Sequence, residues 1–438
     1  MGDVVMALGM QALLTLALLR GPWIRLHPAL ATGVVVMGGA LLGAIAFRVS
    51  HYTGMPPFWS VGLLVIVAGS LSVLAQRHFP ASESGFPPEA GMSGVGPVPL
   101  WERLACYGMW AAFAFILFVY LWANGVQPPS LYQAAFPWGE DVHPPNLYSA
   151  LFEWSDPART GDQVRGFALS LSAFYLQFAD SDLGWKFLWS VLGLFPWLAL
   201  FGGLRELGVR PAAAVLAVAG PAGSVAALFW GSTGHPDLFL SGCVLMLFFL
   251  AATPRPLGRW LLPLGLLILF WSGPLWAALG TLMGLAGTAM RPGSSAQRGL
   301  WAGAAVIVLA YWGWVTSFGG ELFGATAAYL AWDAFHIARY GVMAYLILAV
   351  AVRYGNREHL QALAAGVALP LLVVMLESTS REGMEIIRID GTRLLTVALL
   401  LGWGVALTIL SAVRVAPSEE QRDPGTSTRN DLEIGRSV

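Results

Sequence analysis

The chain has 438 residues, of which 57% are hydrophobic and only 11% are charged, and its mean hydropathy is +0.66. A soluble domain carries about 25% charged residues, so this composition excludes a soluble enzyme, a nucleic-acid-binding protein and a disordered protein. The formal net charge of −1 provides no overall positive field for attracting nucleic acid. Abundant glycine and tryptophan are typical of a polytopic membrane protein, where glycine allows close helix packing and tryptophan gathers at the interfaces.

Apolar runs of roughly 20 residues, the length that crosses a hydrocarbon core, recur along the whole sequence. We therefore predict an all-α transmembrane bundle of about thirteen spans. Between 258–272 and 275–290, the break at Gly273 leaves a single re-entrant hairpin as an alternative to two spans. No basic region precedes the first run, so we expect a span there and not a cleavable signal. The remaining predicted spans lie near 4–20, 30–47, 58–76, 104–123, 184–204, 211–230, 236–252, 299–317, 338–352, 359–376 and 392–413.

Composition divides the chain into four parts. Residues 1–77 form an N-terminal three-span segment, and residues 78–103, rich in glycine, proline and serine, form a cytoplasmic linker. Residues 104–414 form the main transmembrane module, which includes a long outer loop at 124–183. The polar tail, 415–438, is predicted to be disordered.

Arginines recur in alternate short loops, and the positive-inside rule places these loops in the cytoplasm. The N-terminus is then outside and the C-terminus inside. Lys186 is the single lysine, and all other Lys or Arg positions are arginine. This composition favours a bacterial source. The predicted location is therefore the bacterial inner membrane. The arginines that set the orientation are Arg205, Arg210, Arg255, Arg259, Arg291, Arg298, Arg353, Arg357 and Arg414.

Acidic residues gather in the loops on the opposite side. These loops are the long 124–183 segment and the shorter 231–235, 318–337 and 377–391 segments. The positive-inside rule predicts few arginines outside but does not require acids there. We therefore expect four loops from distant parts of the sequence to converge on one site at the outer membrane surface.

The strongest chemical motif lies in the long outer loop. Glu140 and Asp141 are adjacent carboxylates, His143 follows two residues later, and Pro144 and Pro145 stiffen the chain beyond it. A base that deprotonates a sugar or lipid hydroxyl must be a carboxylate or a histidine within hydrogen-bond reach. The alternative is a solvated acidic turn in which Asp141 caps a helix.

The stretch from Asp141 to Tyr148 resembles the loop motif of the GT-C superfamily of integral-membrane glycosyltransferases, in which an acid precedes His-Pro-Pro and an aromatic residue. The closest pattern is that of bacterial relatives of protein O-mannosyltransferases and aminoarabinose transferases. The resemblance covers roughly residues 104–300. It implies that Asp141 is the catalytic base or orients the acceptor, with Glu140 and His143 beside it and Tyr148 contacting substrate. It also implies a juxtamembrane amphipathic helix at 165–183.

This sequence departs from that family in two respects. Three spans precede the module here, whereas the family's module usually begins with its first span. The family often carries a soluble C-terminal domain, and here only a short tail follows. Both departures are compatible with an unfamiliar acceptor.

A short outer loop places His235 and Asp237 at the start of a span. Ordinary helix capping explains an acid at this position equally well. In the family, this loop often holds polar residues that line the site, so the resemblance implies that both residues bind substrate.

Two later stretches carry further candidates. Arg393 enters the last span from the outer side, where it could pair with Asp390 or, together with Arg388, bind a lipid phosphate. Asp333 and His336 are three residues apart and share one face of a helix. That helix is either an interfacial anchor or part of a site for Mg or Mn, which oxygen and nitrogen ligands suit.

These features favour a glycosyltransferase that moves a sugar from a polyprenyl-phosphate lipid to a hydroxyl of a lipid, glycan or protein acceptor at the outer face. The lipid-phosphate leaving group supplies the energy, and the sequence has no nucleotide-binding fingerprint. Another lipid-handling enzyme, an acyltransferase or polymer ligase with His235 or His336 as base, is the alternative. A secondary transporter is the third possibility, although the predicted spans carry little charge.

Overall fold

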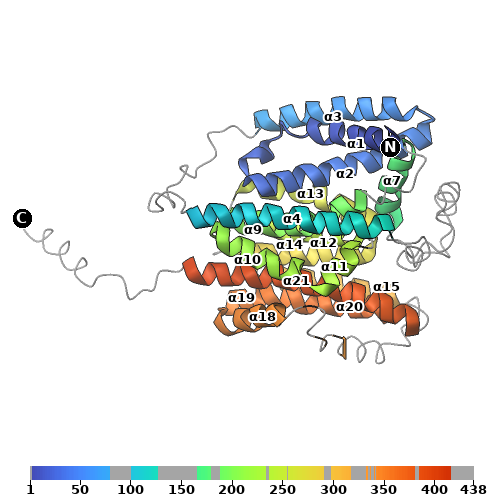
Figure 1. Cartoon of the computed structure of the whole chain (residues 1–438). Helices are drawn as coiled ribbons and strands as arrows, with labels where there is room; N and C mark the ends of the chain where they lie inside the picture. The colour runs from blue at the N-terminus through green and yellow to red at the C-terminus, as the bar shows by residue number, and fades with distance from the viewer. Residues whose placement is uncertain are drawn as a thin grey trace, which may run out of the picture.

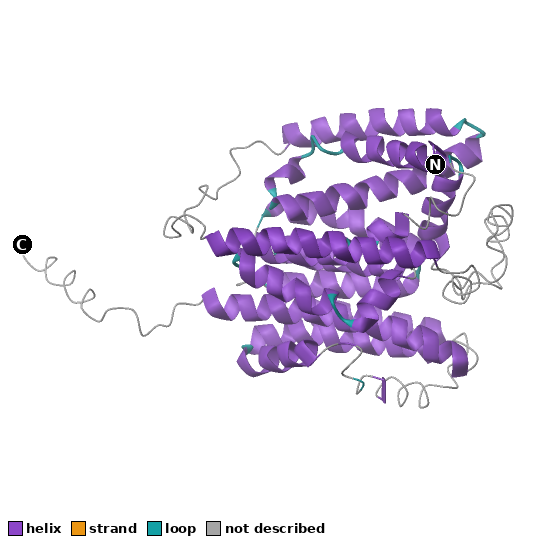
Figure 2. Cartoon of the chain, viewed as in Figure 1, coloured by secondary structure: helices purple, strands orange, loops and turns teal. Residues whose placement is uncertain are grey.

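The computed structural model is a helical bundle, and over the residues that it describes every regular element is a helix (Figure 2). This confirms the all-α prediction for those residues. The structure describes residues 2–78, 100–126, 165–178, 188–232, 236–253, 255–290, 297–316, 332–333, 336, 340, 342–379 and 384–415.

The N-terminal segment contributes three long helices that pack together. α1 (Gly2–Ala17) runs against α2 (Pro28–Thr53), and α3 (Pro57–His78) packs on both; the short 3-10 helix η1 (Pro22–Arg25) connects the first two. α2 also packs against α7 (Arg165–Leu176) and α9 (Phe195–Glu206). The N-terminal helices are therefore part of the same packed bundle as the helices that follow.

The remaining helices form the body of the bundle (Figure 1). Most lie side by side along one direction, and α7 crosses them near the end where α1 begins. Their bounds are α4 (Leu100–Val126), α10 (Pro211–Ala222), α11 (Val225–Ser232), α12 (Pro236–Ala252), α13 (Pro256–Ser272), α14 (Pro274–Ala289), α15 (Gln297–Thr316), α18 (Val342–Tyr354), α19 (Arg357–Leu363), the π-helical turn η6 (Ala364–Ala368), α20 (Leu369–Thr379) and α21 (Met384–Val415).

α12 is the centre of the bundle. Every residue from Pro236 to Ala252 is buried, and the helix packs against α9, α13, α14, α21 and α2. A helix that is apolar on all sides suits either a protein core or the lipid of a membrane, and this one lies in the protein core. It begins at the end of the bundle that carries Asp237 and Asp333, called here the acidic end. It ends beside Arg25, Arg205 and Arg255, called the arginine-rich end.

Five helical stretches among the described residues are long and apolar enough to cross a membrane. A sixth is obtained if α10 and α11, which meet at an angle of 74°, form one broken span. Exposed aromatic side chains near both ends, such as Trp59 at one and Trp260 at the other, suit the two membrane interfaces. Each predicted apolar run contains a helix, whereas the number of about thirteen spans remains a prediction. The five stretches are Pro28–Thr53, Pro57–His78, Leu188–Glu206, His359–Leu376 and Leu394–Ser411.

The structure differs from the sequence prediction at two places. The predicted span at 211–230 is broken, because Pro221 cannot donate within α10 and Gly223 follows it. α21 begins at Met384, so Arg388 lies on a helix and not in a loop. A helix, α7, lies within the predicted segment 165–183, and all its described side chains are buried, so an amphipathic helix parallel to the membrane remains a prediction.

Close approach of α14 to α12 depends on Gly287. A Cβ there would overlap the carbonyl oxygen of Phe248, whereas a Cβ at Gly284, one turn earlier, meets nothing within 4 Å. We expect Gly287→Ala to destabilise the fold by about 2 kcal/mol and Gly284→Ala to change stability by less than about 1 kcal/mol.

The melting temperature can be measured through Cys243, which is fully buried in α12. In a Cys106→Ser background, a thiol-reactive dye labels Cys243 when the protein unfolds during heating in detergent. Equal melting temperatures for the two variants would contradict this packing.

Candidate functional site at the acidic end

α11 is the meeting point of segments that carry the predicted site residues. Tyr120 of α4 is fully buried, and its hydroxyl donates to the carbonyl oxygen of Ala227 at 3.3 Å. A Cβ at Gly231 would overlap the Tyr120 ring, so the glycine makes room for it. α4 leads into the loop that contains Asp141. The second half of α4 is therefore held against α11, the helix that precedes His235 and Asp237 in the chain.

A second contact joins α11 to α21. Tyr340 is buried in a cluster with Ala226 of α11 and with Leu395 and Leu399 of α21. Its hydroxyl donates to the carboxylate of Asp333, which has no exposed surface. The phenol thus stabilises a carboxylate inside the bundle. Asp333 is thereby placed beside both α11 and the buried part of α21.

Asp237 lies in the first turn of α12 and is 2% exposed. An acid in this position faces the positive end of the helix dipole, which stabilises its charge. Only three residues separate this helix from α11. Asp237 therefore follows α11 closely in the chain, and Asp333 is connected to α11 through Tyr340, which packs with Ala226.

The arginine candidates lie on α21. Arg388 and Arg393 belong to its first ten residues, and the buried stretch of the helix begins directly afterwards at Leu394. Arg393 is thus two residues before Leu395, which packs against Tyr340. Their side chains are not described. The backbone nevertheless places Arg393 within one helical turn of the Tyr340 cluster.

The structure gives the side chains of His336 and Asp333 different partners. Its ring lies 4.2 Å from that of Trp332, and Nδ1 is 3.1 Å from the Trp332 carbonyl oxygen. This contact requires a proton on Nδ1, so Nε2 is the basic nitrogen. The side chain of Asp333 instead turns inward to Tyr340. The His336 amide donates to the Asp333 carbonyl oxygen.

The remaining candidates lie outside the described residues. They are Glu140, Asp141, His143, Tyr148 and His235. Within the described part of the chain, no three His, Cys, Asp or Glu side chains come together to hold a metal ion. The Mg or Mn site remains a prediction.

Sequence reasoning missed Arg48. It lies near the end of α2 that faces α7, on the side opposite to the arginine-rich loops. Its Nε donates to Ser170 of α7 at 2.8 Å, and its guanidinium carbon is 5.9 Å from the ring centroids of Phe47 and Tyr52. The signal was available, because an arginine at the arginine-poor end of an apolar span departs from the positive-inside pattern.

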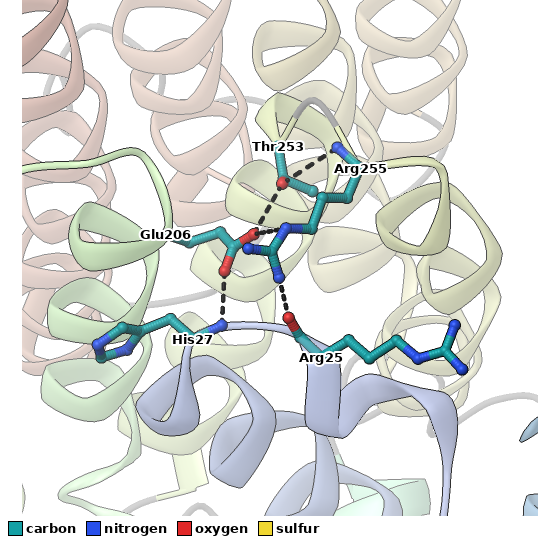
Figure 3. Close-up of polar contacts among 5 residues, drawn as sticks. All are labelled: Arg25, His27, Glu206, Thr253 and Arg255. Atoms are coloured by element: carbon teal, nitrogen blue, oxygen red, sulfur yellow. Dashed lines mark hydrogen bonds and ion pairs between the residues drawn. The ribbon is translucent and has the colours of Figure 1, made fainter. Parts of the chain in front are cut away.

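A polar cluster at the arginine-rich end has a different character (Figure 3). The Glu206 side chain is 2% exposed, and its carboxylate accepts hydrogen bonds from the His27 amide at 2.6 Å and the Thr253 hydroxyl at 3.2 Å. Arg255 Nε lies 3.1 Å from the same carboxylate, and its guanidinium also donates to the Arg25 carbonyl oxygen. One acid therefore joins η1, α2, α9 and the turn before α13.

His27 in this cluster is held neutral. Burial, and then the positive charges of Arg205 and Arg255, lower the pKa of His27 from 6.5 to about 4. The neutral ring is also required by the fold, since its Nδ1 accepts from the Ala29 amide at 3.3 Å and caps α2. A positive charge on His27 would also be repelled by the positive end of the α2 helix dipole.

This pKa predicts a pH dependence of stability. Between pH 6.5 and about 4 the unfolded chain binds a proton at His27 that the folded chain does not, so stability is lost as pH falls through this range. We expect a loss of about 1 to 2 kcal/mol, reduced from the full shift because the ring is partly exposed. His27→Asn keeps a capping oxygen but cannot titrate. Its melting temperature should fall less between pH 7 and 5 than that of the wild type. If the melting temperatures of His27→Asn and the wild type fell equally between pH 7 and 5, His27 would not be the source of the pH dependence.

In comparisons with protein families, curated proteins and solved structures, none matches this chain. The fold and the apolar helices define a class, an all-helical protein with several helices suited to crossing a membrane.

Proposed function

We propose that the chain is an integral-membrane glycosyltransferase of the GT-C type, which transfers a sugar from a polyprenyl-phosphate lipid to an acceptor hydroxyl. The observation that carries the proposal is the meeting of segments at α11. Tyr120 anchors the helix that leads to Asp141, and Tyr340 anchors Asp333 beside α21, which carries Arg393. A base, a phosphate-binding arginine and polar substrate contacts are needed together for this reaction.

In the proposed reaction, Asp141 takes the proton of the acceptor hydroxyl. The acceptor oxygen forms a bond to the anomeric carbon of the sugar, and the bond between that carbon and the phosphate oxygen breaks. The electron pair leaves with polyprenyl phosphate, whose charge Arg393 stabilises. The proton on Asp141 then passes to water. Inversion at the anomeric carbon follows from a single displacement.

The orientation is part of the same proposal. Arg25, Arg205 and Arg255 lie at the end of the bundle where α12 ends, and α21 also ends on that side (Figure 1). The positive-inside rule then places the C-terminus in the cytoplasm and the acidic end outside. With about thirteen spans, the N-terminus is outside. The bacterial inner membrane remains the proposed location.

The test uses purified full-length protein and a panel of polyprenyl-phosphate hexoses and pentoses labelled in the sugar, with a short alkyl glycoside or a hydroxylated peptide as acceptor. We expect release of polyprenyl phosphate together with an alkali-stable labelled product for at least one donor. Transfer of an acyl group from a lipid in the same preparation, lost in His235→Ala but not in Asp141→Asn, would instead support the acyltransferase or ligase.

A secondary transporter is favoured by one specific observation. The pair α10 and α11 is bent by 74° at Gly223, and the buried Asp237 follows directly after α11. Broken helices near buried charge are typical of transporters. Proteoliposomes distinguish the two functions, because a transporter moves solute across the membrane without releasing polyprenyl phosphate. Solute uptake without any transfer product would favour transport.

A further inference from the structure

The N-terminal segment holds α7 through two polar contacts. Near the middle of α7, Arg48 Nε donates to the Ser170 hydroxyl at 2.8 Å, and Ser170 is fully buried. Just beyond its end, Gln177 Nε2 donates to the Ser50 hydroxyl at 3.4 Å, and Ser50 in turn donates to the Met55 carbonyl oxygen. Both contacts come from the same end of α2.

Aromatic packing reinforces this attachment. The ring of Phe178 meets that of Phe58, at the start of α3, with centroids 5.3 Å apart. On the other side of α7, Trp189 Nε1 donates to the Ser172 hydroxyl at 2.9 Å, and Phe167 stacks on Phe239 of α12 at 6.0 Å. α7 is therefore fixed between the N-terminal helices and the central helix.

α7 is the first described helix after Asp141 in the chain. α7 is the element with which the described chain resumes after Asp141, and Tyr120 anchors the helix with which it ends before Asp141. Arg48 is the charged member of the attachment, and a hydrogen bond from a charged group contributes more than a neutral one. α1 and α2 thus contact α7 directly, and α3 contacts Phe178 just beyond the end of α7.

We infer that Arg48 is a positioning residue: through Ser170 it holds α7, and with it the end of the outer loop, in register with the proposed site. The N-terminal segment is then a working part of the site and not a separate membrane anchor. The catalytic consequence rests on the proposed function, whereas the attachment itself does not.

Hydrogen–deuterium exchange of the full-length protein in detergent tests the attachment. In Arg48→Met, the amides of α7 should exchange about tenfold faster, while peptides from α9 and α12 keep the wild-type rate. Arg48→Lys keeps a charged donor and should restore part of the protection. Arg20→Met, at an exposed arginine of the same segment, is the matched control and should leave α7 unchanged.

Ser170→Ala removes the hydroxyl that accepts from Arg48 but keeps the arginine. This variant therefore tests the attachment of α7 if Arg48→Met does not fold. Faster exchange confined to α7 in Ser170→Ala supports the inference. Wild-type exchange of α7 in Ser170→Ala, or an equal increase in α9 and α12, overturns it.

Activity provides the second measurement. A positioning role predicts a several-fold lower kcat in Arg48→Met with an unchanged KM for the lipid donor, and recovery of kcat in Arg48→Lys. An unchanged kcat combined with faster exchange of α7 would overturn the role in positioning. If the wild type transfers no sugar from any donor, the proposed function fails, and the exchange result still decides the attachment.

Discussion

Asp141→Asn is expected to reduce sugar transfer by about 10²- to 10⁴-fold, the usual contribution of a general base. The amide has nearly the size of the carboxylate but cannot accept the proton of the acceptor. Donor binding should change little, since Arg393 is the proposed phosphate contact. The loss should therefore appear in kcat and not in the KM for the polyprenyl-phosphate sugar.

Two matched variants make this result specific. Glu140→Gln removes the neighbouring charge and should cost less than tenfold if Asp141 is the base. His235→Ala should lower transfer only moderately under the same proposal. If Glu140→Gln or His235→Ala abolishes transfer while Asp141→Asn retains it, the assignment of the base is wrong.

Glu206→Ala is expected to destabilise the fold by about 3 kcal/mol, the largest structural effect that we predict. The carboxylate is buried and accepts from His27, Thr253 and Arg255, so its removal breaks three polar contacts inside the bundle. The helices joined by this acid come from both the N-terminal segment and the main module. Loss of Glu206 should therefore weaken the packing of the N-terminal segment against the main module at the arginine-rich end.

The loss is measured by labelling Cys243 with a thiol-reactive dye in the Cys106→Ser background during a thermal ramp. Arg210→Ala is the control, because it removes an exposed arginine from the same end of the bundle. Glu206→Gln keeps a side-chain oxygen and should lie between alanine and wild type. A melting temperature of Glu206→Ala equal to that of Arg210→Ala would show that the cluster contributes nothing to stability.

Hydrophobic runs predicted the helices well because burial of an apolar helix depends mainly on local composition. The predicted span 236–252 coincides with α12, the most buried helix of the bundle. The break between α10 and α11 was missed, although Pro221 and Gly223 mark it, because a count of apolar residues ignores lost hydrogen bonds.

Contacts between distant residues could not be predicted from a single sequence. Glu206 and His27 are 179 positions apart, and nothing local to either indicates the other. The same limit applies to Arg48 and Ser170, which are 122 positions apart. Helical spacing predicted a shared helix face for Asp333 and His336, but it gave no indication that the Tyr340 hydroxyl donates to the Asp333 carboxylate. Charge pattern indicated which end of the bundle carries the candidates but not which side chains meet.

An experimental structure with a non-transferable polyprenyl-phosphate sugar bound tests the central claim most directly. The account predicts the phosphate within hydrogen-bond distance of Arg393, the anomeric carbon facing Asp141, and both beside α11. A lipid bound elsewhere, with Asp141 in bulk solvent and far from Arg393, would contradict it.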